Sequence, residues 1–202
     1  MGICYIVGAG DFSGGFTPTS EDLVIAADGG YDHLMRHGIR CDLLLGDLDS
    51  ISEVPRDAEL IAYPVRKDET DMHLAYLEGA SRGYNIFNIY GGTGGREDHT
   101  YANYCLLLYI RNRGGRATLF SNLAEVTLIK DESLCILGEK GKHLSLFPFG
   151  SECTGVCVSG AEYECENLTL SPEFPITVSN IFKSSPVNIS VGKGALLVMK
   201  EI

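Results

Sequence analysis

The chain has 202 residues, 45% of them hydrophobic and 21% charged, which is the composition of an ordinary globular protein of one large or two small domains. Its net charge of −11 argues against nucleic acid as a partner, because binding to phosphate backbones requires clustered Lys and Arg. The sequence has no apolar run near the roughly 20 residues of a membrane span, no signal-peptide pattern and no CxxC pair among its seven cysteines. We therefore expect a cytoplasmic protein that binds neither nucleic acid nor membrane.

Short apolar runs alternate with helical patterns over the first 120 residues. We expect strands at about residues 3–7, 23–27, 43–46, 60–63, 85–90 and 117–120. Apolar spacing and glycine stops predict helices from about residue 30, over 71–82 and over 99–112. This alternation predicts an α/β fold, a doubly wound, mostly parallel α/β/α domain at residues 1–124.

Aspartates follow several of these predicted strands. Asp28 comes after the second strand and Asp47 and Asp49 after the third, while Asp68 precedes the next helix and Asp71 begins it. The carboxyl ends of parallel strands form one edge of a sheet, where ligands bind, and carboxylate oxygens suit Mg²⁺. The alternative for Asp47 and Asp49 is a solvated turn, and for Asp68 and Asp71 it is favourable interaction with a helix N-terminus.

Two glycine-rich strings also follow predicted strands. Gly8 and Gly10 form an incomplete dinucleotide-binding fingerprint, because position 13 is Ser. The string Gly91-Gly92-Thr93-Gly94-Gly95-Arg96 leaves backbone N–H groups free to surround an anion, and the Arg96 guanidinium suits phosphate oxygens. It lacks the Gly-Lys-Ser/Thr ending of a Walker A loop, and a flexible surface loop is the alternative.

The pattern changes after about residue 125. Short strand candidates recur every 8–12 residues between Gly, Pro, Asn and Ser turns, with no helical period. They lie at residues 125–129, 133–137, 144–147, 156–159, 168–170, 176–179, 187–191 and 195–199. We expect a C-terminal all-β domain at residues 125–202, built as a sandwich or jelly roll.

Four strings in the first domain resemble, in order and spacing, the motifs of the thiamine pyrophosphokinase family. They are Ala27-Asp28-Gly29-Gly30, Gly46-Asp47-Leu48-Asp49-Ser50, Lys67-Asp68-Glu69-Thr70-Asp71 and Gly91 to His99. The segments 145–148, 160–163, 178–180 and 192–198 resemble that family's thiamine-binding β domain. The resemblance therefore covers essentially the whole chain.

This resemblance implies an enzyme that transfers diphosphate from ATP to the hydroxyl of thiamine, giving thiamine diphosphate and AMP. It also implies a homodimer, with thiamine in a cleft shared between the α/β domain of one subunit and the β domain of the other. The implied metal ligands for Mg²⁺ are Asp47, Asp49 and Asp71, and the implied catalytic set adds Arg96 and Asp98. The implied ATP-binding residues are Asp28, Gly29, Gly30, Lys67, Asp68, Thr70, Gly92, Gly94 and Gly95, and the implied thiamine-binding residues are Tyr163, Ser179 and Asn180.

The chemistry of such a transfer leaves some roles open. The thiamine hydroxyl must attack the β-phosphorus, and either Asp71 or Asp98 is a candidate to accept its proton. The chain has no Trp, and Tyr163 is the aromatic candidate to stack on the cationic thiazolium. Two alternatives remain open: another nucleotide-dependent kinase or phosphohydrolase acting on a small alcohol, and a ligand-binding or sensor protein on the same scaffold.

Overall fold

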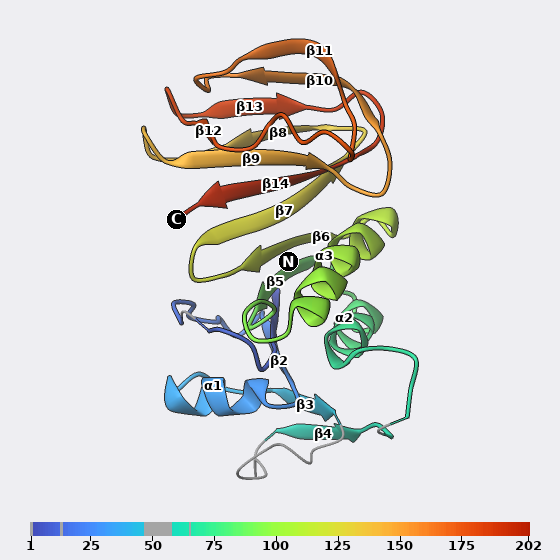
Figure 1. Cartoon of the computed structure of the whole chain (residues 1–202). Coiled ribbons are helices and arrows are strands. Elements are labelled where there is room, and N and C mark those ends of the chain that lie inside the picture. Colours follow the sequence, from blue (N-terminus) through green and yellow to red (C-terminus); the bar gives the residue numbers. More distant parts are fainter. Residues whose placement is uncertain (1, 13, 47–57, 65) are drawn as a thin grey trace. The chain divides into compact units, whose positions relative to one another are not determined.

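The structure, a computed structural model, describes residues 2–12, 14–46, 58–64 and 66–202 (Figure 1). The chain forms two compact units, Met1–Asn122 and Leu123–Ile202. Asp47 and Asp49, expected to bind a metal, lie outside the described residues. Within the described part of the chain, no helix is both long enough and apolar enough to cross a membrane.

The first unit is built on parallel strands in the order β6-β5-β1-β2-β3-β4. The strands are β1 (Cys4–Val7), β2 (Leu23–Ala27), β3 (Leu43–Gly46), β4 (Glu59–Ala62), β5 (Ile86–Tyr90) and β6 (Arg116–Phe120). The first three are fully buried, as expected for strands covered on both faces by helices. These strands match the predicted ones to within about a residue.

Helices cover the two faces of this sheet. They are α1 (Gly30–Arg36), α2 (Asp71–Ser81) and α3 (Glu97–Asn112). Tyr5 of β1 packs in one cluster with Leu34 of α1, whereas its neighbour Cys4 faces Gly79 of α2. Because successive strand residues point to opposite faces, α1 and α2 lie on opposite sides, with α3 beside α2 (Figure 1). The unit is the doubly wound α/β/α layer that the sequence predicts.

The strand order reverses beside β1. The chain first adds β2, β3 and β4 on one side of β1 and then returns to place β5 and β6 on the other side. The loops that follow β1 and β5 therefore leave adjacent strands at the same edge of the sheet. In open α/β sheets this switch point is where ligands bind.

The second unit consists of antiparallel strands in two sheets, ordered β12-β9-β14-β7 and β11-β10-β13-β8. The strands are β7 (Ala124–Lys130), β8 (Ser133–Ile136), β9 (His143–Pro148), β10 (Cys153–Ser159), β11 (Cys165–Leu170), β12 (Asn180–Ile181), β13 (Val187–Ser190) and β14 (Ala195–Glu201). Leu146 and Val198 from one sheet and Val156 and Ile189 from the other belong to one buried core. This is the predicted all-β sandwich, so the fold class is confirmed.

One strand prediction in this unit is wrong. Residues 176–179, expected as a strand, form a turn that leads into the two-residue strand β12. Ser179 has a φ of 60°, in the left-handed region that interrupts an extended chain. The apolar residues Ile176 and Val178 suggested a strand from sequence, but both are about half exposed at the surface of this unit.

Candidate active site

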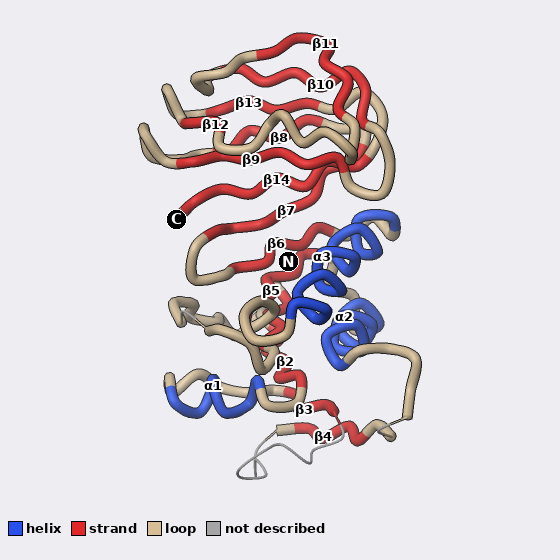
Figure 2. The backbone as a smooth tube through the Cα atoms, in the orientation of Figure 1, coloured by secondary structure: helices blue, strands red, loops and turns tan. Residues whose placement is uncertain are grey.

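A cavity of about 690 Å³ lies in the first unit at the switch point. Residues 8–12, which follow β1, and residues 91, 92 and 94–96, which follow β5, form much of its wall. The segment that joins β5 to α3 is a loop (Figure 2). Thr70 and Asp71, where α2 begins, also line it. Helix N-termini and glycine-rich turns both present backbone N–H groups, so the cavity suits a ligand that carries several negative charges.

The two loops at the switch point are bonded to each other through their backbones. The N–H groups of Gly10 and Asp11 donate to the carbonyls of Gly91 and Thr93, at 2.9 and 2.7 Å. A Cβ atom on Gly10 would lie 2.2 Å from the Thr93 carbonyl oxygen, and one on Gly91 would lie 2.1 Å from that of Gly8. Only glycine permits this approach, so the glycines serve a defined packing of the two loops and not flexibility alone.

Carboxylates from three segments line the cavity: Asp11 after β1, Asp28 after β2, and Asp71 at the start of α2. A Cβ atom on Gly46, the last residue of β3, would lie 3.1 Å from the Asp28 Cβ. The side chain of Asp28 therefore occupies the space that Gly46 leaves open. No group of three or more His, Cys, Asp or Glu side chains close enough to hold a metal ion occurs in the described residues.

Asp71 has a cationic partner, Lys67. The Lys67 Nζ donates to Asp71 Oδ1 at 2.6 Å, and the Lys67 side chain is only 12% exposed. Thr70 caps the same helix by accepting a hydrogen bond from the N–H of His73 at 3.2 Å. The capping interaction and the ion pair together hold Asp71 at the N-terminus of α2.

Arg96 and Asp98 form an exposed ion pair at the start of α3. The Arg96 Nε donates to Asp98 Oδ1 at 3.1 Å, and Nη2 donates to the other carboxylate oxygen. The hydrogen bonds from Arg96 are the main cause that lowers the pKa of Asp98 below its ordinary value. Asp98 is therefore a weak base in this arrangement, and its carboxylate orients the guanidinium that lines the cavity.

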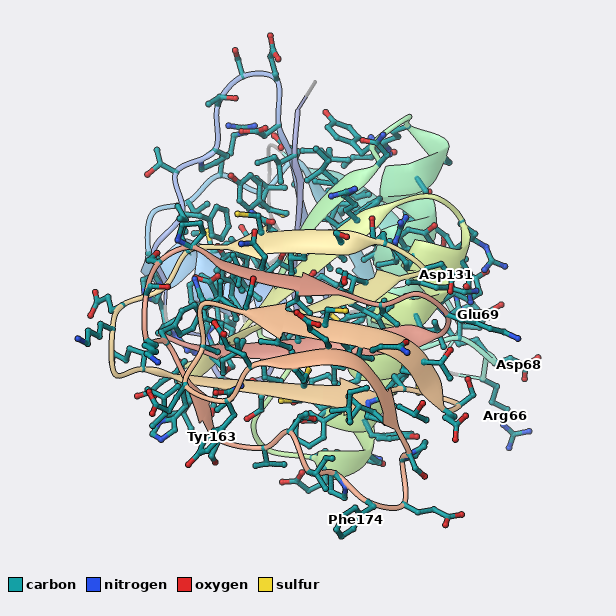
Figure 3. The ribbon with its side chains drawn as sticks, turned by 90° about the horizontal axis from the view of Figure 1, so that it is seen from above. Arg66, Asp68, Glu69, Asp131, Tyr163 and Phe174 are labelled. Atoms are coloured by element: carbon teal, nitrogen blue, oxygen red, sulfur yellow. The ribbon has the colours of Figure 1, made fainter. Side chains whose placement is uncertain are left out.

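The cavity brings together many of the residues that the sequence predicts for ATP and catalysis. Those that line it are Asp28, Thr70, Asp71, Gly92, Gly94, Gly95 and Arg96. Lys67 and Asp98 reach it only through their ion-pair partners, and Asp68 is an exposed side chain that points away from the ribbon (Figure 3). Gly29 precedes α1, and Gly30 begins it so close to β1 that a Cβ would lie 1.9 Å from the Val7 carbonyl oxygen.

The sequence did not single out several other residues that line the cavity. They are Asp11, Phe12, His33, His99, Asn103 and Asn122. His33 is held by a contact of 2.8 Å between its Nε2 and the Gly10 carbonyl, and its ring stacks on Phe12 with centroids 5.2 Å apart. The incomplete glycine fingerprint, Gly8 and Gly10, was the sequence pattern that could have predicted that the loop after β1 lines the cavity.

A smaller cavity, of about 160 Å³, lies in the second unit and contains two of the three predicted thiamine residues, Tyr163 and Asn180. Its wall is mainly apolar, with Leu168, Ile176 and Val178. Tyr163 is 70% exposed at the surface of this unit (Figure 3). An apolar cavity with an accessible aromatic ring suits a flat organic cation.

The Asn180 amide is engaged by the backbone of Tyr163. Its Oδ1 accepts from the Tyr163 N–H at 3.0 Å and its Nδ2 donates to the Tyr163 carbonyl at 2.8 Å. Ser179, the third predicted residue, donates its N–H to Ser145 Oγ at 3.0 Å and is not part of the cavity wall. Asn180 therefore orients Tyr163, and this contact arises between segments that the sequence alone does not pair.

A further hollow, of about 1010 Å³, lies over the sheet β11-β10-β13-β8. Its wall is rich in small side chains such as Ser133, Cys157 and Ser190, and its charged members are Glu164 and Glu166. It contains none of the residues predicted for ATP, metal or catalysis. With two carboxylates and no Lys or Arg among the described residues of its wall, this hollow would repel a phosphate ligand. We therefore assign no catalytic role to it.

The switch-point cavity is typical of a nucleotide-dependent phosphotransferase, and the comparison with known families is more specific. Residues 18–119 match the family "Thiamin pyrophosphokinase, catalytic domain", and residues 126–196 match "Thiamin pyrophosphokinase, vitamin B1 binding domain". The chain belongs to the thiamin pyrophosphokinase family. This confirms the resemblance seen in the sequence and the predicted enzyme class, a diphosphotransferase that makes thiamine diphosphate from thiamine and ATP.

Individual relatives agree with this assignment. A thiamine pyrophosphokinase of Bacillus subtilis is 27% identical over 186 residues, which cover 89% of this chain and 87% of that protein. Thiamine pyrophosphokinase 1 of rice, Oryza sativa, is also 27% identical, over 74% of this chain and 62% of its own length. The crystal structure of thiamine pyrophosphokinase from Bacillus subtilis superposes with a TM-score of 0.90, covering 100% of this chain and 99% of that one at 24% identity.

Proposed function

We propose that this chain catalyses the transfer of diphosphate from ATP to the hydroxyl of thiamine, giving thiamine diphosphate and AMP. The observation that carries the proposal is the cavity at the switch point, where a glycine-rich loop and Arg96 lie beside Asp28 and Asp71. The family assignment supplies the identity of the two substrates.

The ATP polyphosphate occupies the switch-point cavity. The backbone N–H groups of the loop before α3 and the N-terminus of α2 lie where they favour phosphate oxygens. Arg96 adds a planar cation that can bond two oxygens at once, held in orientation by Asp98. Lys67 supplies a second positive charge when its ion pair with Asp71 opens.

Mg²⁺ is the metal that this donor set fits. Carboxylate oxygens are hard ligands, and Asp28 and Asp71 place two of them on the cavity wall. We propose Asp71 as a ligand, with Asp47 and Asp49, which follow β3 directly in sequence, as the others. When bound, the ion neutralises phosphate charge that the chain, at −11, otherwise repels.

The reaction forms one P–O bond and breaks another, and the thiamine hydroxyl loses its proton to a base. The thiamine hydroxyl oxygen bonds to the β-phosphorus, the bridge between the α- and β-phosphates breaks, and AMP leaves with the bridging oxygen. Arg96 stabilises the charge that develops on the transferred phosphates. Asp71, which lines the cavity, and Asp98, which pairs with Arg96, are the two candidates to accept the hydroxyl proton.

Thiamine binds at the smaller cavity of the β unit. Tyr163 presents a ring to its cationic thiazolium, and Asn180 holds that ring in place through the backbone. A cavity of about 160 Å³ is smaller than the roughly 300 Å³ at the lower end of ordinary ligand sites. We therefore also propose a homodimer, in which the partner subunit completes the thiamine site.

The proposal is tested by incubation with ATP, Mg²⁺ and thiamine and by quantifying both products. We expect AMP and thiamine diphosphate in equal amounts, each dependent on thiamine and on Mg²⁺. Formation of ADP, or of free phosphate without thiamine, contradicts it. For the homodimer, a mixture of inactive Asp71→Asn and Ser179→Arg chains should recover activity, and failure after verified subunit exchange contradicts the shared site.

A further inference from the structure

We propose that Asn103, a residue of α3, is a positioning residue for ATP that fixes the peptide plane between Gly92 and Thr93. Its Nδ2 donates to the Gly92 carbonyl at 2.7 Å, and its side chain lines the switch-point cavity. The inference rests on the proposed function only in taking ATP as the ligand of this cavity. The contact itself links the buried face of α3 to residues 91–95, which we call the glycine loop.

Asn103 is buried where an apolar residue would ordinarily lie. It is 5% exposed, and in the part of the chain that the structure describes it is one of two buried polar side chains, the other being Asn180. Its neighbours on the same face of α3 are Leu106 and Ile110, both buried. Placing an amide among them is unfavourable unless it is hydrogen-bonded, so the bond to Gly92 accounts for its presence there.

Three consecutive carbonyls of the glycine loop are bonded to the rest of the unit. Those of Gly91 and Thr93 accept from the backbone after β1, whereas that of Gly92 accepts from Asn103. In a planar trans peptide the C=O and N–H groups point in opposite directions. By fixing the Gly92 carbonyl, Asn103 therefore directs the Thr93 N–H away from α3.

The glycine loop depends on these hydrogen bonds because a glycine-rich backbone has little conformational preference of its own. Gly91, Gly94 and Gly95 all have a positive φ, between 61° and 80°, and glycine adopts many other conformations at little cost. Gly92 itself is packed: a Cβ there would lie 3.1 Å from Leu119 Cδ1 and 3.3 Å from Ile89 Cγ2. Without the Asn103 hydrogen bond, Gly92 should stay packed in place, but its carbonyl should be able to turn. We therefore expect ATP binding to weaken more than the stability of the fold.

The test compares two variants of Asn103 with a matched control on the same helix. Asn103→Leu keeps the volume and removes the donor, and Asn103→Asp keeps the shape and places a carboxylate against the Gly92 carbonyl. Asn112→Leu changes the exposed last residue of α3, outside the cavity. ATP affinity is measured by calorimetry with Mg²⁺, together with the melting temperature and the KM for each substrate.

We expect the Kd for ATP to rise about tenfold in Asn103→Leu, which matches the loss of one buried hydrogen bond, and further in Asn103→Asp. The KM for thiamine should stay within about twofold in both, and Asn112→Leu should bind ATP as the parent does. A folded Asn103 variant with the parent's Kd, or an equal rise in both KM values, overturns the inference alone. A parent chain that does not bind ATP overturns both this inference and the proposed function.

Discussion

The two cavities of this chain are built in different ways. The cavity of the α/β unit is built largely from backbone, with the glycine loop, the loop after β1 and the N-terminus of α2 around it. The cavity of the β unit is built from side chains, with Tyr163, Ile176 and Val178. The first arrangement suits a ligand of high charge and the second a flat, partly apolar one.

The two cavities nevertheless share one feature, a buried asparagine amide that is hydrogen-bonded to loop backbone. Asn103 bonds the Gly92 carbonyl in the first, and Asn180 bonds both backbone groups of Tyr163 in the second. Both amides are buried. In each case a buried amide is hydrogen-bonded to the backbone of a loop. Because the two amides line different cavities, we expect substitutions of Asn103 and Asn180 to affect different substrates.

The largest effect is expected from Asp71→Asn, which removes a charge from the backbone-built cavity. We expect turnover to fall about 100-fold or more, because Asp71 is a proposed metal ligand and a candidate proton acceptor. The measurement is the initial rate of AMP formation, with a melting curve to show that the variant folds. The control is Glu78→Gln, which lies on the same helix as Asp71 and alters an ion pair with Arg82. This variant should keep the parent's rate.

A second substitution, Asn180→Leu, tests the side-chain-built cavity. It leaves the Tyr163 N–H and carbonyl without their partner, which should destabilise the chain by about 2 kcal/mol. The KM for thiamine should rise while that for ATP stays within about twofold. Urea unfolding and steady-state kinetics measure the two effects, and an increase in the KM for ATP alone would remove Asn180 from the thiamine side.

Tyr163→Ala probes the ring itself. Loss of stacking on a cation is worth about 1 kcal/mol, so the KM for thiamine should rise about fivefold. Tyr163→Phe should restore the parent's KM because it retains the ring. Phe174→Ala is the matched control, since both rings lie at the surface of this unit (Figure 3), with Phe174 71% and Tyr163 70% exposed. Phe174 does not line the cavity. Equal effects of the two alanine substitutions would contradict the proposed role.

The smallest effect concerns pH and the α/β unit alone. Burial is the main cause that lowers the pKa of His73 below its ordinary value of 6.5. The unfolded chain therefore takes up this proton more readily than the folded chain, and acidification from about pH 7 to about pH 5.5 should favour unfolding. His73→Gln should melt with a shallower dependence on pH over that range. A slope equal to the parent's would show that His73 does not contribute.

The sequence predicts most of the strands and many of the residues that line the switch-point cavity, because its signals there are local. Glycine and aspartate follow buried strands directly, and parallel topology places their tips at one edge. Asn103 was missed because it lies within an otherwise apolar helical face, three residues before Leu106 and seven before Ile110. A polar residue at that spacing was a usable signal.

The missing parts of the site depend on contacts between distant segments. The bonds from Gly10 and Asp11 to the glycine loop join residues about 80 apart in the chain, and no periodicity reveals them. The turn at 176–179 looked like a strand because alternating apolar residues are also used to line a cavity. Local patterns thus predict elements, whereas the packing of loops against each other requires the tertiary structure.

The central claim is that two phosphates leave ATP together, and isotope tracing tests it most directly. The unmodified chain is supplied with thiamine, Mg²⁺ and ATP labelled at either the α- or the β-phosphorus. Diphosphate transfer predicts that the β label appears in thiamine diphosphate and the α label in AMP. Recovery of the β label in ADP, with a monophosphate ester of thiamine or free phosphate as the other product, would contradict it.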